Sequence, residues 1–157
     1  MTMTKNQKAF LDMIAWSEIG PALLATSDNG YNVIVGSTPE HPDLFTSYAD
    51  HPRKLVKLNA RLWSTAAGRY QLIERYFDDY KRILHLPDFS PARQDAIALQ
   101  QIRESRALDA IEAGDLETAI QRCAHIWASL PGNTYQQHVN PIDNLKMAFQ
   151  QAGGSLA

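Results

Sequence analysis

Apolar positions recur at helical spacing over much of the chain. Between residues 5 and 17, Phe10, Met13 and Ile14 fall on one face of a helix. The same pattern predicts five further helices, over residues 69–84, 91–104, 107–113, 116–130 and 142–152. Ser90-Pro91 is a typical helix start. Gly114 is expected to end the helix over residues 107–113 in a left-handed conformation.

Two short stretches have the character of strands instead. Residues 31–35 are rich in β-branched side chains and are bounded by glycines, and residues 45–48 follow a loop over residues 37–43 that contains two prolines. We therefore predict a small antiparallel sheet in the N-terminal third. Strands and helices do not alternate, so the fold class is α+β and helix-dominated, without a parallel sheet.

Length and charge limit the classes of function that this sequence could have. The 157 residues fit a single domain over residues 1–157, and the formal net charge of −2 argues against a dedicated nucleic-acid binder. The one cysteine, Cys123, cannot form an internal disulfide and lies on an apolar helix face, so we expect it in the core. No secretory signal and no apolar run long enough for a membrane span is recognisable, so membrane insertion is not expected.

Metal and nucleophile motifs are missing from the sequence. The five histidines form no His-Glu-x-x-His pattern, and neither a Gly-x-Ser-x-Gly motif nor a phosphate-binding glycine loop occurs. We expect no metal site and no cofactor.

Glu18 is the carboxylate that stands out. It is predicted at the C-terminal end of the first helix, close to Trp16, Ile19 and Leu23. The negative end of the helix dipole and apolar surroundings both disfavour a charged carboxylate, so both raise its pKa toward that of a general acid. The alternative is an ordinary solvated glutamate at a helix end.

Two polar stretches could bind a ligand. Residues 64–71 combine small side chains with Arg69 and Gln71, which could hold hydroxyl or amide groups, and residues 131–135 end in Tyr135, which could stack on a sugar. A plain helix entry and a surface loop are the alternatives. Residues 50–61 are locally basic and could contact an anionic polymer or form a solvated face.

Several segments, in order over nearly the whole chain, resemble the lambda-type phage endolysins, the lambda lysozyme family. They are Ala9–Met13, Ala15–Glu18, Tyr31 with Val33–Gly36, Asp50–Val56, Ala67–Leu72, Asp88–Pro91, Ala98–Ile102 and Ile126–Gly132. Ile19 stands where that family's best-known member has glycine, and Asn32 where it has aspartate.

This resemblance implies a lysozyme-like fold of two lobes with a cleft between them. It implies lytic transglycosylase activity on peptidoglycan, in which the C6 hydroxyl of N-acetylmuramic acid replaces water and a 1,6-anhydro end is formed. Glu18 matches the catalytic glutamate. Gln71 and Tyr135 are expected in the cleft, and the expected substrate-binding set also includes Asn32, His51 and Arg69.

Two other functions stay open at this point. A hydrolytic muramidase would need a second carboxylate, for which Asp50 is the first candidate, and a wall-binding module would have no turnover. With the leading interpretation, we expect a monomer made in the host cytoplasm that reaches the periplasmic peptidoglycan with the help of a holin.

Overall fold

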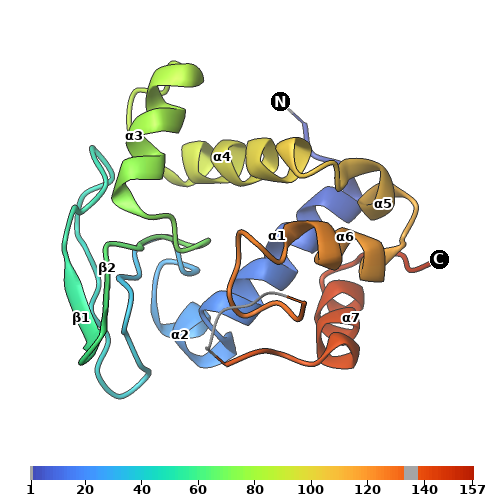
Figure 1. Cartoon of the computed structure of the whole chain (residues 1–157), viewed down its shortest axis with the longest axis horizontal. Helices are drawn as coiled ribbons and strands as arrows, with labels where there is room; N and C mark the ends of the chain where they lie inside the picture. The colour runs from blue at the N-terminus through green and yellow to red at the C-terminus, as the bar shows by residue number, and fades with distance from the viewer. Residues whose placement is uncertain (1, 133–137) are drawn as a thin grey trace. The chain divides into compact units, whose positions relative to one another are not determined.

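The computed structural model describes residues 2–132 and 138–157 (Figure 1). The chain forms two compact units. One, here called the helical unit, contains the chain up to Glu18 and from Ala98 onward, and the other, the hairpin unit, runs from Ile19 to Ile97. Helix α4 (Pro91–Glu104) begins in the hairpin unit and ends in the helical unit.

The helical unit is built around α1 (Lys5–Glu18), which buries side chains on most of its circumference, including Phe10, Met13 and Ile14. It packs against α5 (Leu108–Glu112) and α7 (Ile142–Gln151), and α5 packs against α6 (Leu116–Cys123). This burial explains why the apolar spacing over residues 5–17 predicted the first helix correctly.

The caps of these helices agree with their sequence signals. Gly114 adopts a φ of 74°, as expected for a residue that ends a helix in the left-handed region. The Asp115 side chain accepts a hydrogen bond from the backbone N–H of Thr118 and so caps α6. Cys123 lies in the core, also as predicted.

One helix is shorter than its apolar pattern suggests. Helix α6 ends at Cys123 rather than at residue 130, and the chain continues in turns in which the N–H groups of Ile126 and Trp127 both bond to the Cys123 carbonyl. Trp127 and Leu130 are still buried. The apolar residues at helical spacing are therefore buried even where the chain is no longer helical.

The hairpin unit contains α2 (Pro21–Thr26), strands β1 (Val56–Asn59) and β2 (Leu62–Ser64), α3 (Glu74–Ile83) and the first turns of α4. The two strands pair antiparallel, with Lys57 opposite Trp63. A core cluster of this unit consists of Ala67, Leu72, Phe77, Phe89 and Ile97.

The fold class is confirmed as helix-rich with a small antiparallel sheet, but other residues form the sheet. Residues 31–35 and 45–48 are not strands. Within the first segment Val33 and Ile34 form isolated bridges, with Leu44 and Ala67, and the second segment forms no bridge with any residue that the structure describes. Gly30 and Gly36 both have positive φ, near 85°, and therefore turn the backbone at both ends of the first segment. Residues 31, 32 and 35 themselves lie in turns, so only Val33 and Ile34 are left to form bridges.

One further helix boundary was wrong, and one helix was missed. Helix α3 begins at Glu74 rather than at residue 69, because positive φ angles at Gly68 and Gln71 break the helical backbone. Helix α2 was not predicted, although Pro21 occupies its first turn, where the missing N–H costs nothing. Among the described residues, no helix is both long and apolar enough to cross a membrane.

Candidate active site and substrate-binding residues

Glu18 is the last residue of α1 and is half-buried. The hydroxyl of Ser129 donates a hydrogen bond to its Oε2 atom. Desolvation by burial raises the pKa of Glu18 above its ordinary value, and this effect outweighs the hydrogen bonds from the Ser129 side chain and backbone, which lower it. The result is a carboxyl group that holds a proton more readily than a solvated glutamate does.

Ser129 is itself held by neighbours in the same unit. Its Oγ atom lies 2.7 Å from Oγ of Ser17, and the Ser17 Oγ accepts a hydrogen bond of 2.8 Å from Nδ2 of Asn140. The backbone N–H of Asn140 donates to the Ser129 carbonyl at 2.8 Å. Glu18 is thus the end of a hydrogen-bond chain that connects the end of α1, the turns after α6 and the segment before α7.

The other predicted residues that the structure describes belong to the hairpin unit. Arg69 is buried, and its Nε atom donates to the Asn29 carbonyl at 3.0 Å while its Nη1 atom donates to the Tyr70 hydroxyl at 3.0 Å. The Tyr70 and Tyr31 hydroxyls both donate to Oδ1 of Asp95, at 2.6 and 2.9 Å. Arg69 therefore fixes the backbone around residue 29 to the loop before α3.

Burial and the Asp95 carboxylate raise the pKa of Tyr31 to about 12, with burial the larger cause. The pKa of Tyr70 is raised as well, again mainly by burial. Both hydroxyls thus stay protonated and act as donors at neutral pH.

Asn32 and Gln71 are half-buried and linked to the same segment. Nε2 of Gln71 donates to the carbonyls of Gly68 and Val33, at 2.9 and 3.3 Å. Oδ1 of Asn32 accepts from the backbone N–H of Asp28 at 2.9 Å. The structure thereby brings Asn32, Arg69 and Gln71 together through the backbone of residues 28–33.

His51 has a different environment from the one expected of a substrate contact. It is 2% exposed, packs against the rings of Phe77 and Phe89, and has both ring nitrogens in hydrogen bonds. Nδ1 accepts from the backbone N–H of Arg53 at 3.0 Å, so Nε2 carries the proton and donates to the Leu72 carbonyl at 2.8 Å. The pKa of His51 is lowered, mainly by burial.

This geometry revises the expectation for two of the residues. His51 and Arg69 are too buried for the direct substrate contact that we expected, and their hydrogen bonds fit a positioning role. Tyr135 lies outside the described residues.

Two of the cations in the basic stretch at residues 50–61 are neutralised by ion pairs. Arg53 forms ion pairs with Asp50, Glu74 and Asp78, at 2.7, 3.0 and 2.6 Å, and Lys54 pairs with Asp43 at 2.7 Å. The hydrogen bond from Arg53 holds the pKa of Asp50 below its ordinary value. Asp50, the expected second carboxylate of a muramidase, is thus already the partner of an arginine.

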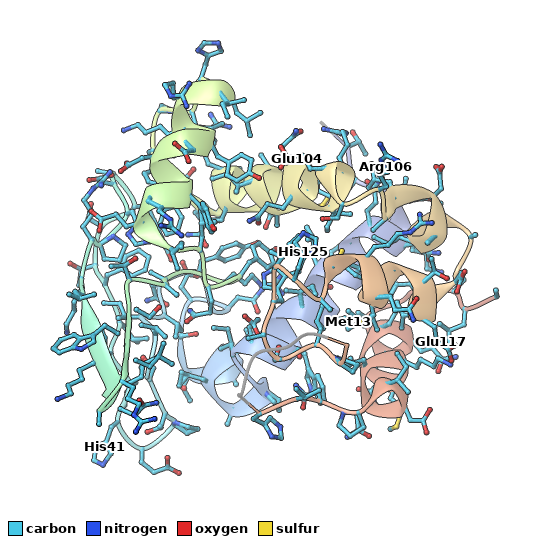
Figure 2. All side chains as sticks on the ribbon, viewed as in Figure 1. Met13, His41, Glu104, Arg106, Glu117 and His125 are labelled. Atoms are coloured by element: carbon cyan, nitrogen blue, oxygen red, sulfur yellow. The ribbon has the colours of Figure 1, made fainter. Side chains whose placement is uncertain are left out.

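Metal ligands do not cluster in the part of the chain that the structure describes: no group of three His, Cys, Asp or Glu side chains could hold an ion. His41 lies in the loop before β1, and His125 follows α6 (Figure 2).

Sequence reasoning did not identify Ser17, Ser129 or Asn140 as functional residues. Ser129 fell inside the predicted helix over residues 116–130, and Asn140 lies in a stretch without an apolar pattern. The one available signal was the sequence Ser129-Leu130-Pro131-Gly132, in which a turn is strongly favoured.

Comparison with known proteins agrees with the resemblance seen in the sequence. Residues 8–156 match the Endolysin family. The endolysin of Escherichia phage lambda is 52% identical over 155 residues, which cover 98% of this chain and 95% of the relative. The endolysin of Escherichia phage P2 is 46% identical over 155 residues, which cover 96% and 94%.

Solved structures give the same result. The lysozyme of bacteriophage lambda in complex with a chitohexasaccharide superposes with a TM-score of 0.93 at 51% identity, covering 100% of this chain and 99% of the other. A second structure of lysozyme from bacteriophage lambda gives 0.89 at 50% identity, with the same coverage. The chain belongs to the endolysin family, and its fold is that of the lambda lysozyme.

Proposed function

We propose that this chain is a peptidoglycan-degrading enzyme that lyses the host of a phage. It cuts the β-1,4 bond between N-acetylmuramic acid and N-acetylglucosamine by transglycosylation rather than hydrolysis. Glu18 is its general acid and base. The observation that carries this proposal is the Glu18 carboxyl with its raised pKa and its hydrogen bond from Ser129.

The reaction needs one carboxyl group. Protonated Glu18 donates its proton to the glycosidic oxygen, and the bond from that oxygen to C1 of the muramic residue breaks. The C6 hydroxyl of the same residue then bonds to C1, and the Glu18 carboxylate takes the hydroxyl proton. The attacking group is tethered to the reacting ring, which gives it the advantage of an intramolecular reaction.

The state of the other carboxylates supports this choice over a hydrolytic muramidase. Asp50, the expected second catalytic carboxylate, pairs with Arg53. Two other aspartates of the same third of the chain also have partners: Asp28 accepts from the Tyr48 hydroxyl, and Asp43 pairs with Lys54. A nucleophilic carboxylate of the retaining type would have to leave such a partner.

Substrate binding divides between contact and positioning residues in this account. Asn32 and Gln71, which are half-buried, contact the glycan, and Tyr135 stacks on a sugar ring. Arg69 and His51 hold the loops on which Asn32 and Gln71 stand. The chitohexasaccharide in the lambda lysozyme complex supports a glycan as the ligand.

The wider biology follows from the same proposal. The chain acts as a single catalytic domain over residues 1–157 and as a monomer. It is made in the host cytoplasm and reaches the periplasmic peptidoglycan through a membrane lesion made by a holin.

The test compares two substrates. Purified peptidoglycan should release soluble muropeptides when incubated with the protein, whereas a chitohexasaccharide, which lacks the muramic residue, should remain intact. Release from neither substrate would contradict the proposed activity, and cleavage of both would contradict the requirement for muramic acid.

A further inference from the structure

The hydrogen-bond chain that ends on Glu18 has a direction, and this direction can be derived atom by atom. It begins at Asn140, whose side-chain amide lies 3.3 Å from the Ser17 carbonyl oxygen and 2.8 Å from the Ser17 hydroxyl. A carbonyl oxygen can only accept, so the amide atom that faces Ser17 must be the NH₂ group. Asn140 is therefore a donor to the Ser17 hydroxyl oxygen.

The far end of the chain fixes the remaining protons. An ionised carboxylate has no proton to give, so the Ser129 hydroxyl must donate to Oε2 of Glu18. Ser129 has then used its only proton, and the contact of 2.7 Å between the two serine hydroxyls is made with the proton of Ser17. Each hydroxyl accepts one hydrogen bond and donates one, and every proton points toward Glu18.

This order distinguishes the two oxygens of Glu18. Oε2 is occupied as an acceptor whether Glu18 is charged or neutral. If the proton were on Oε2, it would meet the proton of Ser129, and the hydrogen bonds between Glu18, Ser129 and Ser17 would have to reverse their direction. Asn140 opposes that reversal, because its NH₂ group cannot accept a proton from Ser17, and the Ser17 hydroxyl would lose the acceptor that Ser129 provides.

We propose that Ser17 and Asn140 are positioning residues for the reaction of Glu18, which hold the Ser129 hydroxyl on Oε2 and leave Oε1 as the oxygen that carries and delivers the proton. The proposal rests on the proposed role of Glu18 as acid and base. It adds a function for two residues that act on Glu18 through Ser129, one on α1 and one before α7. The backbone N–H of Asn140 also donates to the Ser129 carbonyl at 2.8 Å, so Asn140 and Ser129 are linked directly as well as through Ser17.

The hydrogen-bond chain from Asn140 to Ser129 also affects the ionisation of Glu18. Hydrogen bonds from Ser129 lower the pKa of Glu18 against the larger effect of burial. A chain of donors polarises its members in the same sense, so loss of Ser17 or Asn140 weakens the bond from Ser129 to the carboxylate. The pKa of Glu18 then rises further.

The experiment measures kcat and KM on soluble peptidoglycan fragments over a range of pH, for Ser17→Ala, Ser17→Thr and Asn140→Leu. Ser17→Ala and Asn140→Leu should lower kcat by about three- to tenfold, the effect of one hydrogen bond of ordinary strength, with KM almost unchanged. The alkaline limb of their kcat profiles should move to higher pH. Ser17→Thr keeps the hydroxyl and should restore both the rate and the limb.

Circular dichroism and thermal unfolding report whether each variant is folded. The comparison of Ser17→Thr with Ser17→Ala isolates the effect of the hydroxyl group, because both variants change the same position. An unchanged alkaline limb in both Ser17→Ala and Asn140→Leu would overturn the proposal. So would equal impairment of Ser17→Ala and Ser17→Thr, which would indicate a packing role. Failure of the underlying function is recognised separately, because Glu18→Gln would then keep the parent activity.

Discussion

The Ser129 hydroxyl donates its proton to Oε2 of Glu18, although the two residues are far apart in the sequence. The bond joins the end of α1 to the turns that follow α6. It places a partner for the carboxylate where burial would otherwise favour only the neutral acid. Glu18 can therefore exist in both protonation states, as a group that first gives and then takes a proton must.

Replacement of Glu18 by glutamine should abolish lysis and leave the fold intact, because the amide has nearly the same shape but cannot donate and reclaim a proton. We expect a loss of at least about a hundredfold in the rate of peptidoglycan solubilisation. Glu104→Gln is the matched control, since Glu104 is also the last residue of a 14-residue helix but is exposed (Figure 2). Residual activity of Glu18→Gln near that of Glu104→Gln would refute the role of Glu18.

The same variant should change how stability depends on pH. The pKa of Glu18 in the folded protein is above its ordinary value of 4.5. At pH values between the unfolded and the folded pKa, the folded state therefore binds more protons than the unfolded state. The contribution of this carboxyl to the free energy of unfolding therefore falls with rising pH. Urea unfolding should show Glu18→Gln gaining stability relative to the parent between pH 4.5 and neutrality, and a difference that does not vary with pH would speak against a raised pKa.

Gly68 should be intolerant of a side chain for two separable reasons. Its φ of 87° disfavours any residue with a Cβ, and a Cβ there would collide with Oε1 of Gln94 and lie 3.0 Å from Cζ of Phe89. Gln94 Oε1 is the acceptor for the Arg69 backbone N–H, at 2.9 Å, so Gly68→Ala also disturbs the loop that carries Arg69 and Gln71. We expect it to destabilise the protein by more than about 1 kcal/mol, the cost of the backbone conformation alone.

Gly153→Ala separates the two causes. Gly153 has a φ of 99°, and the nearest atom to an added Cβ is Cε of Lys5, at an ordinary contact distance of 3.6 Å. Chemical denaturation should therefore show a smaller loss for Gly153→Ala than for Gly68→Ala. Equal losses would mean that the contact with Gln94 contributes little.

Much of the helical architecture could be predicted because its signals are local. The first helix, the start of α4 at Pro91 and the cap at Asp115 all follow from spacing or capping residues within a few positions. The strands could not be predicted in the same way. Val56–Asn59 and Leu62–Ser64 are short and mostly exposed, so they lack an alternating apolar face, whereas residues 31–35 have β-branched side chains but glycine turns at both ends.

The candidate site was predictable only in part, and for a related reason. Glu18 could be singled out because a carboxylate at a helix end among apolar residues is unusual in itself. Ser129 and Asn140 are ordinary polar residues whose importance comes from tertiary contacts with Ser17 and Glu18. Likewise, His51 looked like a binding residue in the sequence, and only its contacts with Phe77 and Phe89 identify it as part of the interior.

The most direct test of the account is mass spectrometry of the fragments released from purified peptidoglycan in water enriched in heavy oxygen. Transglycosylation forms the new bond within the muramic residue, so the fragments should end in 1,6-anhydromuramic acid, be lighter by one water than hydrolysed fragments, and contain no heavy oxygen. Reducing muramic ends that carry the heavy isotope would contradict the account. They would require a hydrolytic mechanism with a second carboxylate, and Asp50 would be the first residue to examine.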